Sequence, residues 1–135
     1  MIKKFTVIAL LVAPILTHAM TVTYYSIDSI AFEGNAANAR ICYLNAPQDT
    51  LQSVQANMSD NAAALKGMSK DQIAATYHGQ FQAIGQGMIC QFDAAKLGVS
   101  QLPAVVIDGQ YVIYGQQDID MAIREYQEYL ERQHV

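Results

Sequence analysis

The stretch Leu97–Gly115, which reads LGVSQLPAVVIDGQYVIYG, decides the fold of this chain. Gly98 stands directly after Leu97, where a left-handed glycine can close a helix without steric cost. The preceding helix is therefore predicted to end there. Pro103 fixes its own φ angle, lacks a backbone N–H and holds the residue before it in an extended conformation, so the next strand begins at or after Pro103.

Two short strands joined by a tight turn are predicted after this proline. Residues 104–107 (AVVI) form an unbroken apolar run, which is typical of a strand covered on both faces. Asp108 and Gly109 supply the positive φ angles of a tight turn, and residues 111–114 (YVIY) have the β-branched and aromatic content of a returning strand. We expect an antiparallel hairpin.

This run, with a C-terminal helical pattern behind it, resembles the second half of a thioredoxin-like domain, in which the proline is characteristically cis. More closely, it resembles a family of small thioredoxin-like exported proteins encoded by integrating conjugative elements. That family shares the motif Gly-(Val/Ile)-x-x-(Ile/Leu)-Pro-Ala-Val-Val-(Val/Ile)-Asp-x-x-Tyr-Val-(Val/Ile)-Tyr-Gly, and residues 43–47 (YLNAP) are similar to the end of one of its strands. The resemblance implies an α/β, thioredoxin-like fold with a small mixed sheet, a C-terminal β-hairpin and helix, and a cis peptide bond at Pro103.

The N-terminus has the pattern of a cleaved signal peptide. Lys3 and Lys4 precede an apolar stretch over residues 5–16, and residues 17–19 (THA) offer small side chains for cleavage after Ala19. The stretch is too short for a membrane anchor, because twelve or so residues at 1.5 Å each cover only about 18 Å of a roughly 30 Å hydrocarbon core. We expect a signal peptide over 1–19, one domain over 20–135, a periplasmic location, and no membrane span after cleavage.

Composition does not support a nucleic-acid-binding surface. Removal of residues 1–19 takes away Lys3 and Lys4 and leaves six basic residues against twelve acidic ones, a net charge of −6. This charge balance does not support a basic face for a phosphate backbone, and no nucleic-acid partner is expected. The remaining 116 residues suit a single domain with its own core.

Two strands and a first helix are predicted before the motif. Residues 21–25 and 40–44 have strand character, and residues 35–38 (NAAN) between them can hold a short helix. One amphipathic helix is expected between a cap at Asp49 or Thr50 and a stop at Gly67, with an apolar stripe formed by Leu51, Val54, Met58, Ala62 and Leu65.

Two further helices follow. Ser69 and Gln72 form a capping box that opens a helix with an apolar stripe of Ile73, Tyr77, Phe81, Ile84 and Met88. Glycines at 79, 85 and 87 each cost about 1 kcal/mol in a helix interior, so a bend or break is predicted near Gly85. A C-terminal helix follows Asp118, with Asp120 at its positive end, Arg132 near its negative end, and a stripe of Ile119, Ala122, Ile123, Tyr126 and Leu130.

The two cysteines, Cys42 and Cys90, are predicted to form a structural disulfide. An even number of cysteines in an exported chain favours a bond, and this is the only intramolecular pairing. A helix broken near Gly85 would turn Cys90 onto the sheet toward Cys42. Closing a loop of about fifty residues stabilises a fold by roughly 4 kcal/mol in the chain-entropy model. Two free, buried thiols are the alternative.

The sequence argues against a thiol–disulfide oxidoreductase. Such enzymes hold a Cys-x-x-Cys pair after the first strand, at a helix N-terminus that lowers the thiol pKa. This chain has Ser26 and Ser29 there and no cysteine before Cys42. Hydroxyl groups cannot exchange disulfides, so no catalytic residue is assigned, and Pro103 is interpreted as structural.

No other group of residues indicates catalysis, a metal site or a cofactor. His78 is the only histidine in the body of the chain, and a metal site needs several convergent ligands. Asp118 and Asp120 are explained by helix capping. The tyrosines are expected mainly in packing, and any that are exposed would form a protein-binding surface; they are Tyr111, Tyr114, Tyr126 and Tyr129.

Two function classes remain. The resemblance implies a non-catalytic periplasmic protein that serves conjugative transfer, as an accessory or assembly component of a type IV secretion system whose protein components are its partners. The alternative is a periplasmic thiol–disulfide oxidoreductase or chaperone that uses Cys42 or Cys90 as a single reactive thiol. Fold alone does not decide between them.

Overall fold

The computed structural model describes residues 19–37 and 39–135. Most of the predicted signal peptide, residues 1–18, lies outside them. The elements in chain order are β1 (Val22–Ser26), β2 (Ala39–Tyr43), α1 (Ala46–Asp60), α2 (Ala62–Leu65), α3 (Lys70–Lys96), β3 (Ala104–Ile107), β4 (Tyr111–Tyr114) and α4 (Ile119–Gln133).

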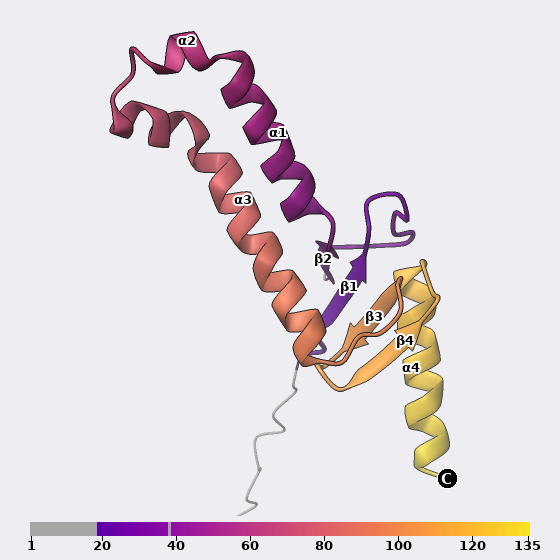
Figure 1. The fold of residues 1–135 in the computed structure, drawn as a ribbon. Helices are drawn as coiled ribbons and strands as arrows, with labels where there is room; N and C mark the ends of the chain where they lie inside the picture. The colour runs from indigo at the N-terminus through magenta and orange to yellow at the C-terminus, as the bar shows by residue number, and fades with distance from the viewer. Residues whose placement is uncertain (1–18, 38) are drawn as a thin grey trace, which may run out of the picture.

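The strands form one mixed sheet in the order β2-β1-β3-β4 (Figure 1). β1 pairs in parallel with β2 and antiparallel with β3, and β3 pairs antiparallel with β4. The Leu102-Pro103 peptide bond is cis, and Asp108 and Gly109 turn the hairpin with φ angles of 53° and 64°. The predicted α/β fold is therefore confirmed, and the arrangement is consistent with a thioredoxin-like one.

Each face of the sheet is covered by a different helix. Because side chains alternate along a strand, Tyr24 of β1 faces α4 while its neighbour Tyr25 faces α3. On the α4 side, a cluster buries Val22, Tyr24, Val105, Ile107, Ile119 and Ala122. On the α3 side, a second cluster buries Tyr25, Cys42, Val106, Cys90 and Ala94. The central strands β1 and β3 are thus buried on both faces, as the apolar run at 104–107 predicts.

The last helix begins where the sequence predicts. The Asp118 carboxylate accepts hydrogen bonds from the backbone N–H groups of Asp120 and Met121, at 2.9 and 3.1 Å. Asp120 lies in the first turn of α4 and Arg132 in its last turn. The helix dipole favours both charges, so the acidic pair is accounted for by capping.

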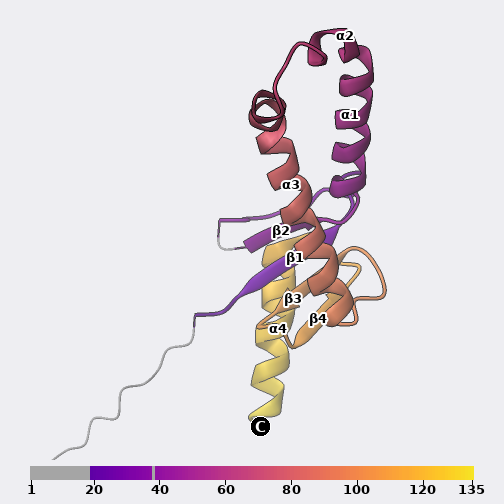
Figure 2. The same cartoon turned by 60° about the vertical axis from the view of Figure 1, so that its left-hand side comes forward.

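The helices α1, α2 and α3 form a helical hairpin that extends well beyond the sheet (Figures 1 and 2). α1 packs along α3. Away from the sheet the helical hairpin buries few residues: Pro47 and Val54 in α1, and Tyr77 in the outer half of α3. The Tyr77 hydroxyl donates to Asn57 Oδ1 at 2.7 Å and joins the two helices away from the sheet. Only the C-terminal end of α3 lies on the sheet.

The predicted break near Gly85 is wrong, because α3 is continuous from its Ser69–Gln72 capping box to Lys96. A Cβ on Gly87 would lie 2.5 Å from Pro47 Cγ, so this glycine allows α1 and α3 to approach closely. Tertiary packing of this kind outweighs the low helix propensity of glycine. The predicted inner stripe of α3 is also partly wrong, since Phe81 and Met88 are exposed.

The boundaries of the first helix also differ from the prediction. α1 begins at Ala46, ahead of the predicted cap at Asp49 or Thr50, because Pro47 fits the first turn of a helix, where its missing N–H has no partner to lose. It ends at Asp60, and the separate short helix α2 follows. Leu51 is 42 % exposed, so the predicted α1 stripe is not a continuous core face.

The connection from β1 to β2 contains no helix in residues 27–37, so the short helix considered for residues 35–38 is not seen in its described part. Glu33 lies beside the start of α4 instead: its N–H donates to the Gln117 carbonyl at 2.8 Å, and its carbonyl accepts from the Ile119 N–H at 3.0 Å. The chain thus passes from β1 to β2 as an irregular connection held by hydrogen bonds to α4.

Candidate functional site

The two cysteines form a disulfide between β2 and α3, as predicted. Cys42 and Cys90 have Cα atoms 5.7 Å apart and are 1 % and 8 % exposed. Tyr25, Ala94 and Val106 pack around them. α3 reaches the sheet as a continuous helix, so the bond forms without the predicted break. The disulfide fixes the base of the helical hairpin to the sheet.

An arginine that sequence reasoning did not single out lies beside this bond. Arg40 Nη2 donates to Cys90 Sγ at 3.4 Å, and Arg40 Nη1 pairs with Asp93 Oδ2 at 2.9 Å. Side chains two positions apart in a strand lie on the same face, so Arg40 and Cys42 share one face of β2. This spacing could have identified Arg40 from the sequence. A hollow of about 410 Å³ adjoins the bond and is lined by residues that include Arg40, Gly87 and Ile89.

The chemistry of this hollow depends on the state of the sulfurs. While Cys42 and Cys90 are bonded, neither sulfur is a nucleophile. The same guanidinium beside a reduced Cys90 would stabilise its thiolate, as cationic neighbours of reactive cysteines do. In the bonded state the pair can take part in disulfide exchange only as the electrophile that an outside thiolate attacks, and the burial of both sulfurs opposes that attack.

The position at which oxidoreductases carry their cysteine pair is occupied by structural side chains. Ser26, at the end of β1, is fully buried and its hydroxyl donates to the Ile30 carbonyl at 3.0 Å. The Tyr24 hydroxyl donates to the same carbonyl at 3.1 Å. Ser26 and Ser29 thus lie in an irregular turn, with no helix N-terminus in residues 27–37 to activate a group placed there.

Pro103 lies between the two regions. It is half-buried, and its carbonyl accepts a hydrogen bond from the Gly115 N–H at 2.9 Å, which fixes the open end of the hairpin. Leu102, before the cis bond, packs against the disulfide cluster. These contacts give Pro103 a packing role that needs no redox partner.

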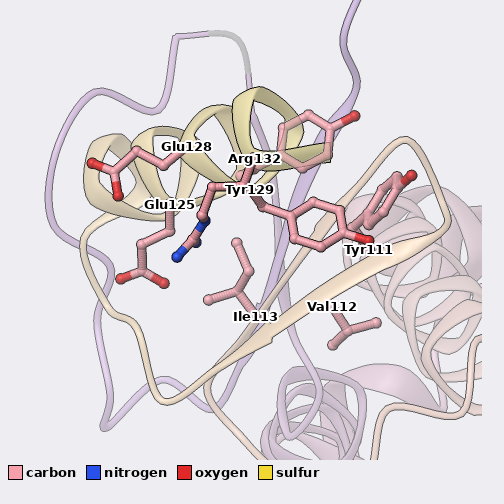
Figure 3. Close-up of a pocket in the computed structure, with 8 residues that line it drawn as sticks. Tyr111, Val112, Ile113, Glu125, Glu128, Tyr129 and Arg132 are labelled. Carbon is pink, nitrogen blue, oxygen red and sulfur yellow. The ribbon is translucent and has the colours of Figure 1, made fainter. Parts of the chain in front are cut away.

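A tyrosine hollow lies between β4 and α4 (Figure 3). It has a volume of about 350 Å³ and is lined by Tyr111, Val112, Ile113, Glu125, Tyr126, Glu128, Tyr129 and Arg132. The ring centroid of Tyr111 lies 4.9 Å from that of Tyr126 and 5.7 Å from that of Tyr129. Figure 3 shows Arg132 reaching from α4 between the aromatic rings and the two glutamates.

The tyrosine hollow combines aromatic surface with charged side chains that form no ion pair in the described part of the chain. Arg40 and Asp93 form the only ion pair in the described part of the chain, so Arg132, Glu125 and Glu128 have none. Tyr129 is 41 % exposed. Burial, followed by the nearby Asp108 carboxylate, raises the pKa of Tyr126, whose hydroxyl donates to Asp108 Oδ2 at 3.5 Å. Amphipathic rings with open charges at their rim suit contact with another protein.

The remaining predicted residues do not join a site. His78 is exposed on α3, and Tyr114 lies at the hairpin end, where its hydroxyl accepts from the Ser100 N–H at 3.3 Å. Hydrogen bonds from the Ser100 side chain and backbone lower the pKa of Tyr114. Residues 19–37 and 39–135 contain no group of three side chains placed to hold a metal ion.

Comparisons with known proteins identify a family without a known function. Among the described residues, no helix has both the length and the apolar character needed to cross a membrane. Neither the curated proteins nor the solved structures give a match. A family model described as "Protein of unknown function (DUF1525)" matches residues 20–132, and the chain belongs to that family.

Proposed function

We propose that this protein is a non-catalytic, thioredoxin-like protein of the periplasm, which serves as an accessory or assembly component of a conjugative transfer system. The system is that of an integrating element with a type IV secretion apparatus. The resemblance of residues 97–115 to exported proteins of such elements supports this proposal, as does the signal-peptide pattern of residues 1–19.

The observation that carries the non-catalytic reading is the structure at the end of β1. The oxidoreductase position holds a buried serine in an irregular turn, and both cysteines are closed in a disulfide elsewhere on the sheet. A fold of this class without an activated thiol retains a stable scaffold and its surfaces. Binding is what such a scaffold can provide.

The surface we assign to that binding is the tyrosine hollow. It lies beside β4, which is an edge strand of the sheet and has one side free of strand partners in the described chain. An extended segment of a partner protein can pair with such an edge, while the adjacent tyrosines contact its side chains. The partner is a protein component of the transfer apparatus.

A second candidate function rests on Arg40. Its guanidinium, 3.4 Å from Cys90 Sγ, favours an oxidoreductase or chaperone that uses Cys90 as a single reactive thiol. The burial of both sulfurs and the absence of a second cysteine beside Cys90 in sequence count against it.

Transfer of the element from donor cells that lack the gene tests the proposal. We expect transfer to fall on deletion and to be restored by the wild-type gene. Tyr129→Ala is expected to weaken the partner contact by about 1–2 kcal/mol and to reduce transfer. The matched control is Met121→Ala, which changes an apolar residue of α4 that is 44 % exposed and lies outside the hollow.

The same assay separates the two functions. A Cys90→Ser protein that is folded and present at wild-type level should still support transfer if the disulfide is only structural. Loss of transfer with that folded protein would favour the single reactive thiol. Unchanged transfer on deletion of the gene would reject the conjugative role altogether.

A further inference from the structure

The face of α3 that points away from α1 and from the sheet carries an exposed apolar stripe. Its residues are spaced alternately four and three apart, at Ala74, His78, Phe81, Gly85, Met88 and Phe92, and all are exposed. Phe81, Met88 and Phe92 are 47 %, 57 % and 68 % exposed. This spacing is the seam of a coiled coil, in which a second helix packs side chains into the gaps.

Gly85, in the middle of this stripe, is not required by any close contact within the chain. A Cβ on Gly85 would meet no atom within 4 Å, whereas one on Gly87 would meet Pro47 at 2.5 Å. Glycine in an exposed helix interior costs about 1 kcal/mol relative to alanine. Gly87 is explained by the contact with α1, whereas Gly85, like Gly79 outside the stripe, has open space beside it, and Gly85 leaves room in the stripe for a side chain from outside.

The charges around the stripe suit a second copy of this protein. The segment from Gln72 to Phe92 contains no Asp, Glu, Lys or Arg, although the chain as a whole is acidic. Two copies can therefore bring these faces together without repulsion between like charges. The charges of α3 lie at its ends, and Asp93 is already paired with Arg40, which leaves Lys70 and Asp71 at one end and Lys96 at the other.

The size of the stripe approaches that of a small dimer interface. With Ile89, which is 54 % exposed beside it, the large side chains leave on the order of 400 Å² of apolar surface, within the range of the largest patch on a typical monomer. Two copies would bury about 800 Å² from these side chains, and the flanking residues of helices about 40 Å long bring the total toward the range of specific interfaces.

We propose that α3 forms an antiparallel, two-fold symmetric dimer with α3 of a second copy. Full overlap of the two helices places Phe81 over the partner's Gly85 and Phe92 over the partner's Ala74, so that large side chains meet small ones. The same overlap sets both Lys70 and Asp71 beside the partner's Lys96, so the charges at the ends of α3 neither favour nor oppose it. A parallel pair would set Gly85 against the partner's Gly85 and leave a gap.

Analytical ultracentrifugation of the disulfide-bonded protein tests this arrangement. We expect the wild-type protein to sediment as a dimer at micromolar concentration. Phe92→Asp places two carboxylates in the seam and weakens the dimer by at least about a hundredfold. Met121→Asp, at a similarly exposed apolar residue of α4, leaves the dimer intact. Thermal melts of each variant verify that the monomer is folded.

A size exchange in the seam tests the direction of the helices. Gly85→Leu has room in the monomer and should weaken the antiparallel dimer, because Phe81 of the partner occupies that space. Adding Phe81→Ala to Gly85→Leu should restore association. A wild-type monomer at all concentrations, or a Gly85→Leu protein that associates more tightly, overturns the proposal. This inference stands independently of the proposed role in conjugation.

Discussion

The end of β1 and the Cys42–Cys90 disulfide lie in the same fold but differ in the side chains that they hold. At the end of β1, where oxidoreductases of this fold class hold their reactive cysteines, the chain has the buried Ser26 and an irregular connection. The sulfur atoms are found instead between β2 and α3, closed in a bond and packed in a core cluster. The difference teaches that cysteines in this fold can join an appended element to the sheet.

That appended element is the helical hairpin. It buries few residues of its own beyond the sheet, and the disulfide joins its longest helix to β2. In the sheet, by contrast, β3 is buried along its whole length. The bond therefore compensates for the small core of the hairpin and holds it in a fixed position on the sheet.

The largest effect is expected from removing the disulfide. A Cys42→Ser/Cys90→Ser double variant should lose about 4 kcal/mol of unfolding free energy, since the bond closes a loop with a sequence separation of 48 residues. Urea unfolding of the variant and of the oxidised wild type measures the loss. Equal stability of the two proteins would show that the bond does not hold the hairpin.

The next largest effects on stability are expected at two glycines of α3, Gly87 and Gly85, where substitution by alanine should act in opposite directions. Gly87→Ala should destabilise the fold by about 1–3 kcal/mol, because its Cβ would overlap Pro47 Cγ. Gly85→Ala should stabilise the monomer by up to about 1 kcal/mol, since its Cβ meets nothing in the chain. Thermal unfolding at concentrations below dimer formation measures both, and the same sign for both would contradict the packing described.

At the end of β1, Ser26→Ala should cost about 1 kcal/mol, because the hydroxyl that donates to the Ile30 carbonyl is lost. The Tyr24 hydroxyl still donates to that carbonyl and keeps the effect small. Urea unfolding checks it. A neutral Ser26→Ala variant that loses a biological activity would instead assign chemistry to this serine.

The smallest effect concerns the tyrosine that faces the disulfide cluster. Burial, and then the Asp93 carboxylate, raise the pKa of Tyr25, while Arg40 opposes the shift. The folded state thus favours the neutral phenol, so this contribution to stability is complete below the ordinary pKa of about 10 and is lost as pH rises through the higher folded value. Tyrosinate absorbance should show Tyr114 titrating before Tyr25 and Tyr126, and Tyr25→Phe should reduce the amplitude of the late step; the reverse order contradicts these environments.

The parts of the fold with local signals were predictable from sequence. The hairpin turn at Asp108-Gly109, the proline before β3, and the caps at Ser69 and Asp118 all depend on residues close in the chain. The disulfide was predictable because only one pairing exists. These features need no knowledge of distant contacts.

The features that the sequence did not predict depend on contacts between elements. Gly87 packs against Pro47 within the continuous α3, a contact that a count of glycines does not reveal. Arg40 becomes part of the site only because α3 places Cys90 and Asp93 beside it. The tyrosine hollow likewise exists only once α4 lies across β4.

Our central proposal is that this protein performs no disulfide chemistry, and dithiol-driven reduction of a model disulfide protein tests it most directly. We predict that the oxidised wild-type protein gives the same rate as buffer containing the dithiol alone, and that its own disulfide resists opening under those conditions. A rate above that blank which is retained in Met121→Ala and lost in Cys90→Ser would contradict the account and assign a reactive thiol to Cys90.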